Sequence, residues 1–152
     1  MKTLILMTAV PGAGKSTWAR EYQATHPHTY IIASDEIRKE LLGHVQNFTN
    51  EPLVWSTFRS RIAEYAERHD DVTVILDAVN YANRGREAYY EQSKMYDRHI
   101  LVYVKRPLEV LLEQNRRRTN DRIVPDQVIA DFYHKFEEPD ESIKDKFEIL
   151  IV

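Results

Sequence analysis

The sequence predicts a single-domain α/β fold, in which a five-stranded parallel sheet is flanked by helices on both faces. Three observations lead to this prediction. The chain has 152 residues, which is the usual size of one domain. Short apolar runs alternate with longer amphipathic stretches, as they do in βαβ units. The apolar runs are mostly continuous, which is typical of parallel strands that are buried on both faces.

The individual elements follow from the same pattern. Five runs rich in β-branched residues are predicted as strands, at residues 4–7, 30–32, 72–76, 100–104 and 147–152. Six stretches between them are predicted as helices, at residues 16–25, 34–42, about 52–68, about 84–97, 107–117 and 125–136. Ser34 is expected to cap the second helix and Gly43 to end it. No repeat or linker interrupts the pattern, so we expect one domain over residues 1–152.

Composition excludes several classes of function. The chain has no cysteine, which excludes disulfides, thiolate zinc sites and a cysteine nucleophile, and fits a cytoplasmic location. No apolar run approaches the ~18 residues of a membrane span, and no signal peptide is expected before the first strand. The net charge is -3, whereas a protein that holds nucleic acid by bulk charge is basic. A polyanion would therefore need a local cluster of cations. The sequence indicates no oligomeric state.

The strongest motif follows the first predicted strand and reads Ala-Val-Pro-Gly-Ala-Gly-Lys-Ser-Thr at residues 9–17. Glycines let backbone N–H groups approach a phosphate closely, and the next helix points its positive N-terminus at the same place. Lys15 would reach the β- and γ-phosphates, and the Ser16 hydroxyl would hold Mg²⁺. The usual first glycine of this motif is Ala9 here. The residues predicted to bind ATP in this loop are Gly12, Ala13, Gly14, Lys15, Ser16 and Thr17.

A second candidate site follows the second strand, at Asp35 and Arg38. Ligands of open α/β sheets bind beyond the carboxyl ends of the strands, which is where Asp35 lies. Asp35 is predicted to accept a proton from an attacking hydroxyl, and Arg38, one helical turn later, to hold a phosphate of the acceptor. The alternative is that Asp35 merely complements the helix dipole and that Arg38 is solvated.

The third strand ends in a carboxylate, Asp77. A carboxylate at this place can bind Mg²⁺ directly or through water, so Asp77 and Ser16 are the predicted metal ligands. A turn or capping role for Asp77 is the alternative. Asn80 follows on the same rim and is predicted to contact the substrate.

Four arginines fall within residues 116–122, in a chain of net negative charge. We expect residues 115–125, called the arginine segment below, to fold over bound phosphates as a lid. Arg118 is predicted to be a catalytic arginine and Arg122 to bind ATP. Arg116 and Arg117 fit a solvated helix end instead.

Other conspicuous residues carry weaker signals. His26 and His28 have no third ligand nearby, so a metal site is not expected there. Trp55 and Phe58 recur at helical spacing and are predicted to pack the core. Phe48 leaves two interpretations open, the lip of a substrate groove or the anchor of a loop.

Together these residues resemble the 5′-kinase domain of the polynucleotide kinase family. The resemblance rests on the run from Pro11 to Arg20, on Asp35 and Arg38 at the expected distance, and on the Val-Pro that ends the arginine segment. It implies an adenylate-kinase-like P-loop kinase that uses ATP and Mg²⁺ to phosphorylate a 5′-hydroxyl of DNA or RNA. It also implies that Asp35 is the general base and that Arg118 lies on the transferring phosphate.

The sequence departs from that family in two further places. Residues 44–59 are shorter and less basic than the corresponding segment, which helps to shape the polynucleotide entrance. The Asp-x-Asp-Gly-Thr motif of the partner phosphatase is absent. A small-molecule alcohol, such as a nucleoside, a sugar or an antibiotic, is therefore an alternative acceptor. A non-catalytic module that senses ATP is the alternative from another class of function.

Overall fold

Five parallel strands form one sheet in the order β2-β3-β1-β4-β5, in a computed structural model that describes residues 1–152. The strands are β1 (Lys2–Thr8), β2 (Thr29–Ala33), β3 (Val72–Asp77), β4 (Arg98–Tyr103) and β5 (Glu148–Ile151). All five predicted strands are confirmed, and the α/β class with them. Only their ends differ from the prediction, by one or two residues.

Seven helices accompany the sheet. They are α1 (Lys15–Thr25), α2 (Ser34–Leu42), α3 (Glu51–Arg68), α4 (Asn83–Gln92), α5 (Leu108–Arg116), α6 (Asp126–Lys135) and α7 (Glu141–Lys146). The six predicted helices are among them. Ser34 is the first residue of α2 rather than its cap, because Ala33 takes that position with extended backbone. No helix is long and apolar enough to cross a membrane.

Two features of the helices differ from the prediction. Helix α4 ends at Gln92 instead of residue 97, because the chain then turns and buries Tyr96, whose hydroxyl donates to the Ile62 carbonyl at 2.7 Å. Helix α7 was not predicted. It has only six residues and is capped by the Asp140 carboxylate, which accepts from the Ile143 N–H at 3.0 Å. Six residues are too few to produce a recognisable hydrophobic period.

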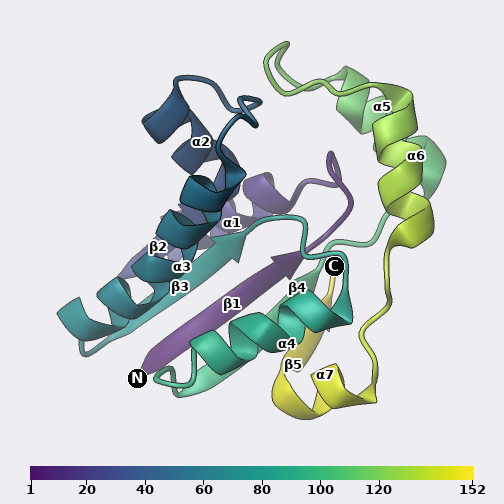
Figure 1. Ribbon diagram of the computed structural model, residues 1–152. Helices are drawn as coiled ribbons and strands as arrows, with labels where there is room; N and C mark the ends of the chain where they lie inside the picture. The colour runs from purple at the N-terminus through teal and green to yellow at the C-terminus, as the bar shows by residue number, and fades with distance from the viewer.

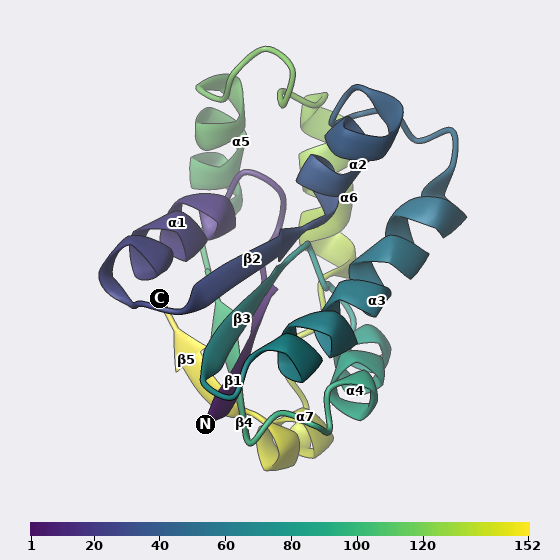
Figure 2. The same cartoon turned by 90° about the vertical axis from the view of Figure 1, so that its left-hand side faces the viewer.

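Helices cover both faces of the sheet. Figure 2 shows α1 on one side of the strands and α3 and α4 on the other. The side chains of β1 alternate between the two faces of the sheet. Leu4 and Leu6 pack in the apolar layer beneath α3. Ile5 and Met7 pack in the apolar layer beneath α1. This burial on both faces explains why the inner strands read as continuous apolar runs. The edge strand β5 differs from the prediction, because its apolar residues Leu150 and Ile151 are 44% and 61% exposed.

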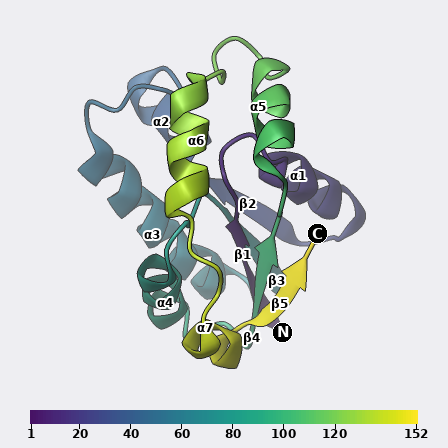
Figure 3. The same ribbon diagram turned by 90° about the vertical axis from the view of Figure 1, so that its right-hand side faces the viewer.

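The carboxyl ends of the strands gather the candidate residues. Figure 1 and Figure 3 place α2 and the connection between α5 and α6 beyond this end of the sheet. The loops after β1, β2 and β3 reach the same edge because the strands are parallel. The phosphate loop, Asp35 and Asp77 are therefore neighbours, although they are far apart in the sequence.

Arg86 of α4 holds this edge together. Its side chain has no solvent exposure, and its guanidinium donates to the Asn80 carbonyl at 3.0 Å, Asn83 Oδ1 at 2.7 Å and Thr8 Oγ1 at 2.9 Å. Burial lowers the pKa of Arg86. These bonds tie the end of β1, the turn after β3 and the start of α4 to one another. The sequence analysis did not single out Arg86.

Replacing Arg86 with methionine is expected to lower the free energy of unfolding by about 3 kcal/mol, because buried acceptors lose their donor. Urea denaturation followed by circular dichroism measures the change. Arg84→Met is the matched control, since Arg84 lies on the same helix but is exposed and forms no hydrogen bond or ion pair. Equal stability of the two variants would contradict the structural role of Arg86.

Candidate active site

The loop between β1 and α1 has the geometry of a phosphate cradle. Gly12 and Gly14 have φ angles of 87° and 103°, a region that only glycine enters at low cost. Ala9, which replaces the usual first glycine, has no positive φ. It is fully buried, and its N–H donates to the Val79 carbonyl at 3.1 Å. Alanine therefore fits this position without strain.

A cavity of about 390 Å³, called the loop cavity below, opens above this loop and has no hydrophobic side chain in its lining. It is lined by Gly12, Gly14, Lys15, Ser16, Thr17, Arg20, Gln114, Arg117, Arg118, Thr119 and Arg122. Of the predicted loop residues, only Ala13 is missing from this lining, because its side chain is buried in the core beneath α1. Its backbone is the only part of Ala13 left to meet a phosphate.

Ser16 and Asp77, the two predicted metal ligands, lie together. Ser16 Oγ donates to Asp77 Oδ2 at 2.7 Å, and Lys15 Nζ lies 3.8 Å from Asp77 Oδ1. Asp77 Oδ1 is buried and has no hydrogen-bond partner. A buried carboxylate oxygen that accepts no hydrogen bond and lies beside a hydroxyl fits Mg²⁺, which prefers oxygen ligands and keeps several bound waters. No group of three acidic or histidine side chains could hold the ion alone, so its other ligands would come from nucleotide phosphates and water.

Asp35 lies at the start of α2, within reach of two arginines. Its Oδ1 accepts from Arg38 Nη1 at 2.9 Å, and its Oδ2 accepts from Arg122 Nη1 at 3.2 Å. The carboxylate is one-third exposed, and it lines a large cavity of about 730 Å³ that also includes Lys15. The two arginines hold the carboxylate at the wall of the large cavity, where a proton acceptor could reach a hydroxyl bound there.

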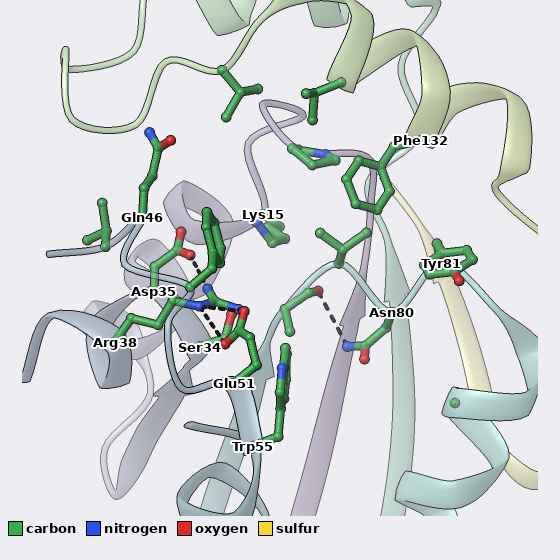
Figure 4. Close-up of a pocket in the computed structure, with 18 of the residues that line it drawn as sticks. Lys15, Ser34, Asp35, Arg38, Gln46, Glu51, Trp55, Asn80, Tyr81 and Phe132 are labelled. Carbon is green, nitrogen blue, oxygen red and sulfur yellow. Dashed lines mark hydrogen bonds and ion pairs between the residues drawn. The ribbon is translucent and has the colours of Figure 1, made fainter. Parts of the chain in front are cut away.

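The large cavity has a mixed lining, in which 11 of the 23 residues are hydrophobic. Figure 4 shows Asp35, Arg38, Glu51 and Trp55 along one wall, with Asn80 and Phe132 across from them. Trp55 was predicted to be a core residue. It packs against the core beneath α3 and also lines this cavity, a second role that helical spacing alone does not reveal.

Arg38 is held by two carboxylates. Its Nε donates to both oxygens of Glu51 at 3.1 Å, and its Nη2 lies 2.9 Å from Glu51 Oε1, while Nη1 binds Asp35. These bonds use three of the five N–H groups of the guanidinium, so one N–H on each terminal nitrogen has no partner. The side chain is 8% exposed. Glu51 was missed by the sequence analysis. In the sequence it was noticeable only as an acidic residue next to Pro52, at the start of a predicted helix.

The side-chain amide of Asn80 uses its nitrogen for a hydrogen bond to the backbone. Its amide nitrogen donates to the Met7 carbonyl at 2.7 Å, and its backbone has a φ of 50°, which asparagine tolerates better than most residues. Its side-chain oxygen makes no hydrogen bond, and the residue lines the large cavity. That oxygen is the atom through which the predicted substrate contact would be made.

The four arginines of the arginine segment divide into two pairs. Arg116 pairs with Asp126 at 2.7 Å, and Arg117 pairs with Glu113, and both arginines are more than 60% exposed. Arg118 instead lines both cavities without a carboxylate partner, and burial lowers its pKa. Arg122 also lines both cavities, where it binds Asp35 and, at 2.6 Å, Glu36.

The arginine segment is also joined to the loop after α2. Gln46 Nε2 donates to the Asp121 carbonyl at 2.6 Å and to the Ile123 carbonyl at 3.3 Å. Together with the Arg122 ion pairs, these bonds close the segment over the carboxyl end of the sheet. No signal in the sequence indicated the role of Gln46.

A 2-3-1-4-5 parallel sheet with a phosphate loop after its central strand and a carboxylate after the neighbouring strand defines the P-loop kinase fold, of the adenylate-kinase-like kind. The chain belongs to the AAA domain family, whose sequence model matches residues 4–139.

Two curated relatives share this region. One is the L-seryl-tRNA(Sec) kinase of Methanococcus maripaludis, with 28% identity over 90% of this chain and 53% of the relative. The other is the adenylate kinase of Pyrococcus furiosus, with 28% identity over 89% of this chain and 64% of the relative. The chain thus spans between half and two-thirds of the length of these relatives.

Among solved structures, the fold is similar to a chain of the Pnkp1/Rnl/Hen1 RNA repair complex. The TM-score is 0.76 and the identity 21%, over 97% of this chain and 46% of that chain. At this identity the comparison shows a common fold.

Proposed function

We propose that this protein transfers the γ-phosphate of ATP to a 5′-hydroxyl of DNA or RNA. One observation carries the transfer itself: the loop cavity and the large cavity share Lys15, Arg118 and Arg122. A nucleotide in the loop cavity and a hydroxyl in the large cavity would meet at these three cations. Asp35 stands on the large-cavity side of the junction, where the hydroxyl would lie.

In the proposed mechanism, Asp35 accepts the proton of the 5′-hydroxyl as its oxygen attacks the γ-phosphorus. The new O–P bond forms while the bond to the β–γ bridging oxygen breaks, and ADP leaves. Lys15 and Arg118 stabilise the negative charge on the transferring phosphoryl oxygens. Arg38 orients Asp35 through their 2.9 Å hydrogen bond and keeps two N–H groups for the acceptor.

Ser16 and Asp77 would hold Mg²⁺ beside the β- and γ-phosphates. The ion would supply charge neutralisation and fix the phosphates in line with the hydroxyl. Arg122 would exchange its carboxylate partners for phosphate oxygens when ATP occupies the loop cavity, since it lines that cavity. Asn80 would contact the acceptor with its unbonded side-chain oxygen.

The choice of a nucleic acid acceptor has two supports. The chain resembles polynucleotide kinases in the residues around the phosphate loop, Asp35 and Arg38, and its fold is similar to that of a protein from an RNA repair complex. The large cavity is also apolar and aromatic enough to receive a nucleobase. An L-seryl-tRNA(Sec) kinase among the relatives adds an RNA-linked substrate in a related protein.

A small-molecule alcohol is the second candidate acceptor, and the pairing of Arg38 favours it. Asp35 and Glu51 already neutralise this arginine, so an acceptor without a phosphate would lose little binding energy. Whether the acceptor is a polymer or a small molecule is the question that a direct assay answers.

Transfer from γ-labelled ATP to a panel of acceptors tests the proposal. The panel holds 5′-hydroxyl DNA and RNA oligonucleotides, 3′-mononucleotides, nucleosides and sugars, each with Mg²⁺ and with EDTA. We expect Mg²⁺-dependent label at the 5′ end of an oligonucleotide, and binding that weakens steeply with salt. Label only on small alcohols would replace the acceptor and keep the mechanism. ATP binding with label on no acceptor would favour a sensor of ATP.

A further inference from the structure

Phe48 is an exposed aromatic residue in a well-fixed loop. Its side chain is 57% exposed and lines the large cavity. The loop around it is held by Asn47, whose amide nitrogen donates to the Leu42 carbonyl at 3.1 Å and whose side-chain oxygen accepts from the Thr49 N–H at 3.1 Å. A large apolar ring kept in water by its own loop gains free energy when a ligand covers it.

The ring of Phe48 is already stacked on a cation. The Arg38 guanidinium carbon lies 4.9 Å from the centre of the Phe48 ring and 5.6 Å from that of Trp55. Because Arg38 is also bonded to Glu51 and Asp35, it cannot move away without breaking two ion pairs. Phe48 is therefore a positioned ring rather than a loosely attached one.

The same ion pairs weaken phosphate recognition at this place. Arg38 carries one positive charge and faces two carboxylates, those of Asp35 and Glu51. A phosphodiester brought to Arg38 would add a third negative charge beside them. Arg38 therefore contributes less to phosphate binding than an unpaired arginine would. The exposed aromatic surface beside it is a second feature by which the acceptor can be recognised.

We propose that Phe48 is a stacking platform for the base of the reacting nucleotide, so that recognition of the acceptor depends on that base as well as on the adjoining phosphate. This inference rests on the proposed function and deepens it. Nucleobases stack on aromatic side chains irrespective of sequence, and removing one such ring lowers affinity roughly 5- to 150-fold. The platform would accept all four bases and would disfavour sugars and other acceptors without a base.

The test is a double-mutant cycle in which the Phe48 ring and the 5′-terminal base are removed singly and together. It compares kcat/KM for a 5′-hydroxyl trinucleotide with that for the same trinucleotide lacking its 5′-terminal base, which keeps the reacting hydroxyl, the sugar and the phosphates. In the wild-type protein, we expect base removal to lower kcat/KM about tenfold or more. In Phe48→Ala, base removal should have almost no further effect, because the ring that held the base is gone.

Two further variants test whether the loss of base preference in Phe48→Ala is due to the missing aromatic ring. Phe48→Trp preserves a stacking surface and should restore the preference for the base-bearing acceptor. Leu53→Ala is the matched control, since Leu53 is an exposed apolar residue of α3 that does not line the large cavity, and it should behave as wild type.

Fluorescence gives a second measurement that does not need turnover. The chain has two tryptophans, and only Trp55 lines the large cavity, whereas Trp18 stacks on Tyr22 of α1. In Trp18→Phe protein, the base-bearing trinucleotide should quench Trp55 and bind about tenfold more tightly than the one lacking its terminal base. Phe48→Ala introduced into the same protein should make the two affinities equal.

The outcomes separate this inference from the proposed function. Equal kcat/KM for the two trinucleotides in the wild-type protein would overturn the platform and leave polynucleotide kinase activity in place. A base effect of the same size in Phe48→Ala would also overturn it, because the base would then be held elsewhere. Label on neither trinucleotide, with label on a sugar, would overturn the proposed function itself.

Discussion

Replacing Asp35 with asparagine is expected to lower kcat by about 10²- to 10⁴-fold while ATP binds as before. Asparagine keeps the size of the side chain but cannot accept the proton of the attacking hydroxyl. Asp35 lines the large cavity and is absent from the loop cavity, and its partner Arg122 keeps its second carboxylate, Glu36. The affinity for ATP should therefore stay close to the wild-type value. Label transfer measures kcat, and isothermal titration calorimetry measures ATP affinity.

Glu36→Gln is the control for that experiment. Glu36 is the next residue of α2 and also binds Arg122, at 2.6 Å, but it does not line the large cavity. The change removes the same charge and should leave kcat within a few-fold of wild type. Normal turnover by Asp35→Asn would show that another group, or solvent, accepts the proton.

Replacing Arg118 with alanine is expected to lower kcat by about 10³- to 10⁵-fold, the range found for arginines that stabilise a transferring phosphoryl group. Arg118 is desolvated and has no carboxylate partner, and its nearest hydrogen-bond acceptor is Asn115 Oδ1 at 3.5 Å. Arg118 is only partly exposed, and a partly buried cation without a hydrogen-bonded anion gains most when negative charge develops nearby. Single-turnover label transfer at saturating ATP separates this effect from nucleotide affinity.

Arg116→Ala is the control for Arg118. It lies two residues away in the same segment, is 63% exposed and binds only Asp126. Its loss should change kcat by no more than a few-fold, since exposed ion pairs contribute little. Arg118→Lys should recover part of the activity, because lysine restores the charge without the planar set of donors. Equal losses in the two alanine variants would contradict the assignment.

Much of the fold could be predicted from the sequence because local patterns determine it. The five strands were predicted from continuous apolar runs such as residues 72–76, whose burial on both faces produces that pattern. Helix α7 and the early end of α4 were missed, because they depend on Asp140 as a cap and on the burial of Tyr96 rather than on a hydrophobic period.

The candidate site divides in the same way. Gly12, Gly14, Lys15 and Ser16 are consecutive or nearly so, and backbone geometry fixes their relative positions once a strand and a helix flank them. Glu51 and Phe48 carry no such local pattern. They acquire a place in the site only because α3 and the loop before it pack beside α2, which brings them to Arg38.

The sequence by itself determined the α/β class, the phosphate loop and the identity of the charged residues at the ends of β2 and β3. The tertiary structure alone decided how those charges are paired. Arg122 reaches Asp35 across 87 residues of chain, and Arg38 divides its donors between Asp35 and Glu51, whereas Arg118 is left without a carboxylate. The physical reason is that backbone conformation and the hydrogen bonds within a helix or turn act between near neighbours in the chain. Ion pairs and desolvation at the site depend instead on distances that exist only after the sheet and its helices have packed.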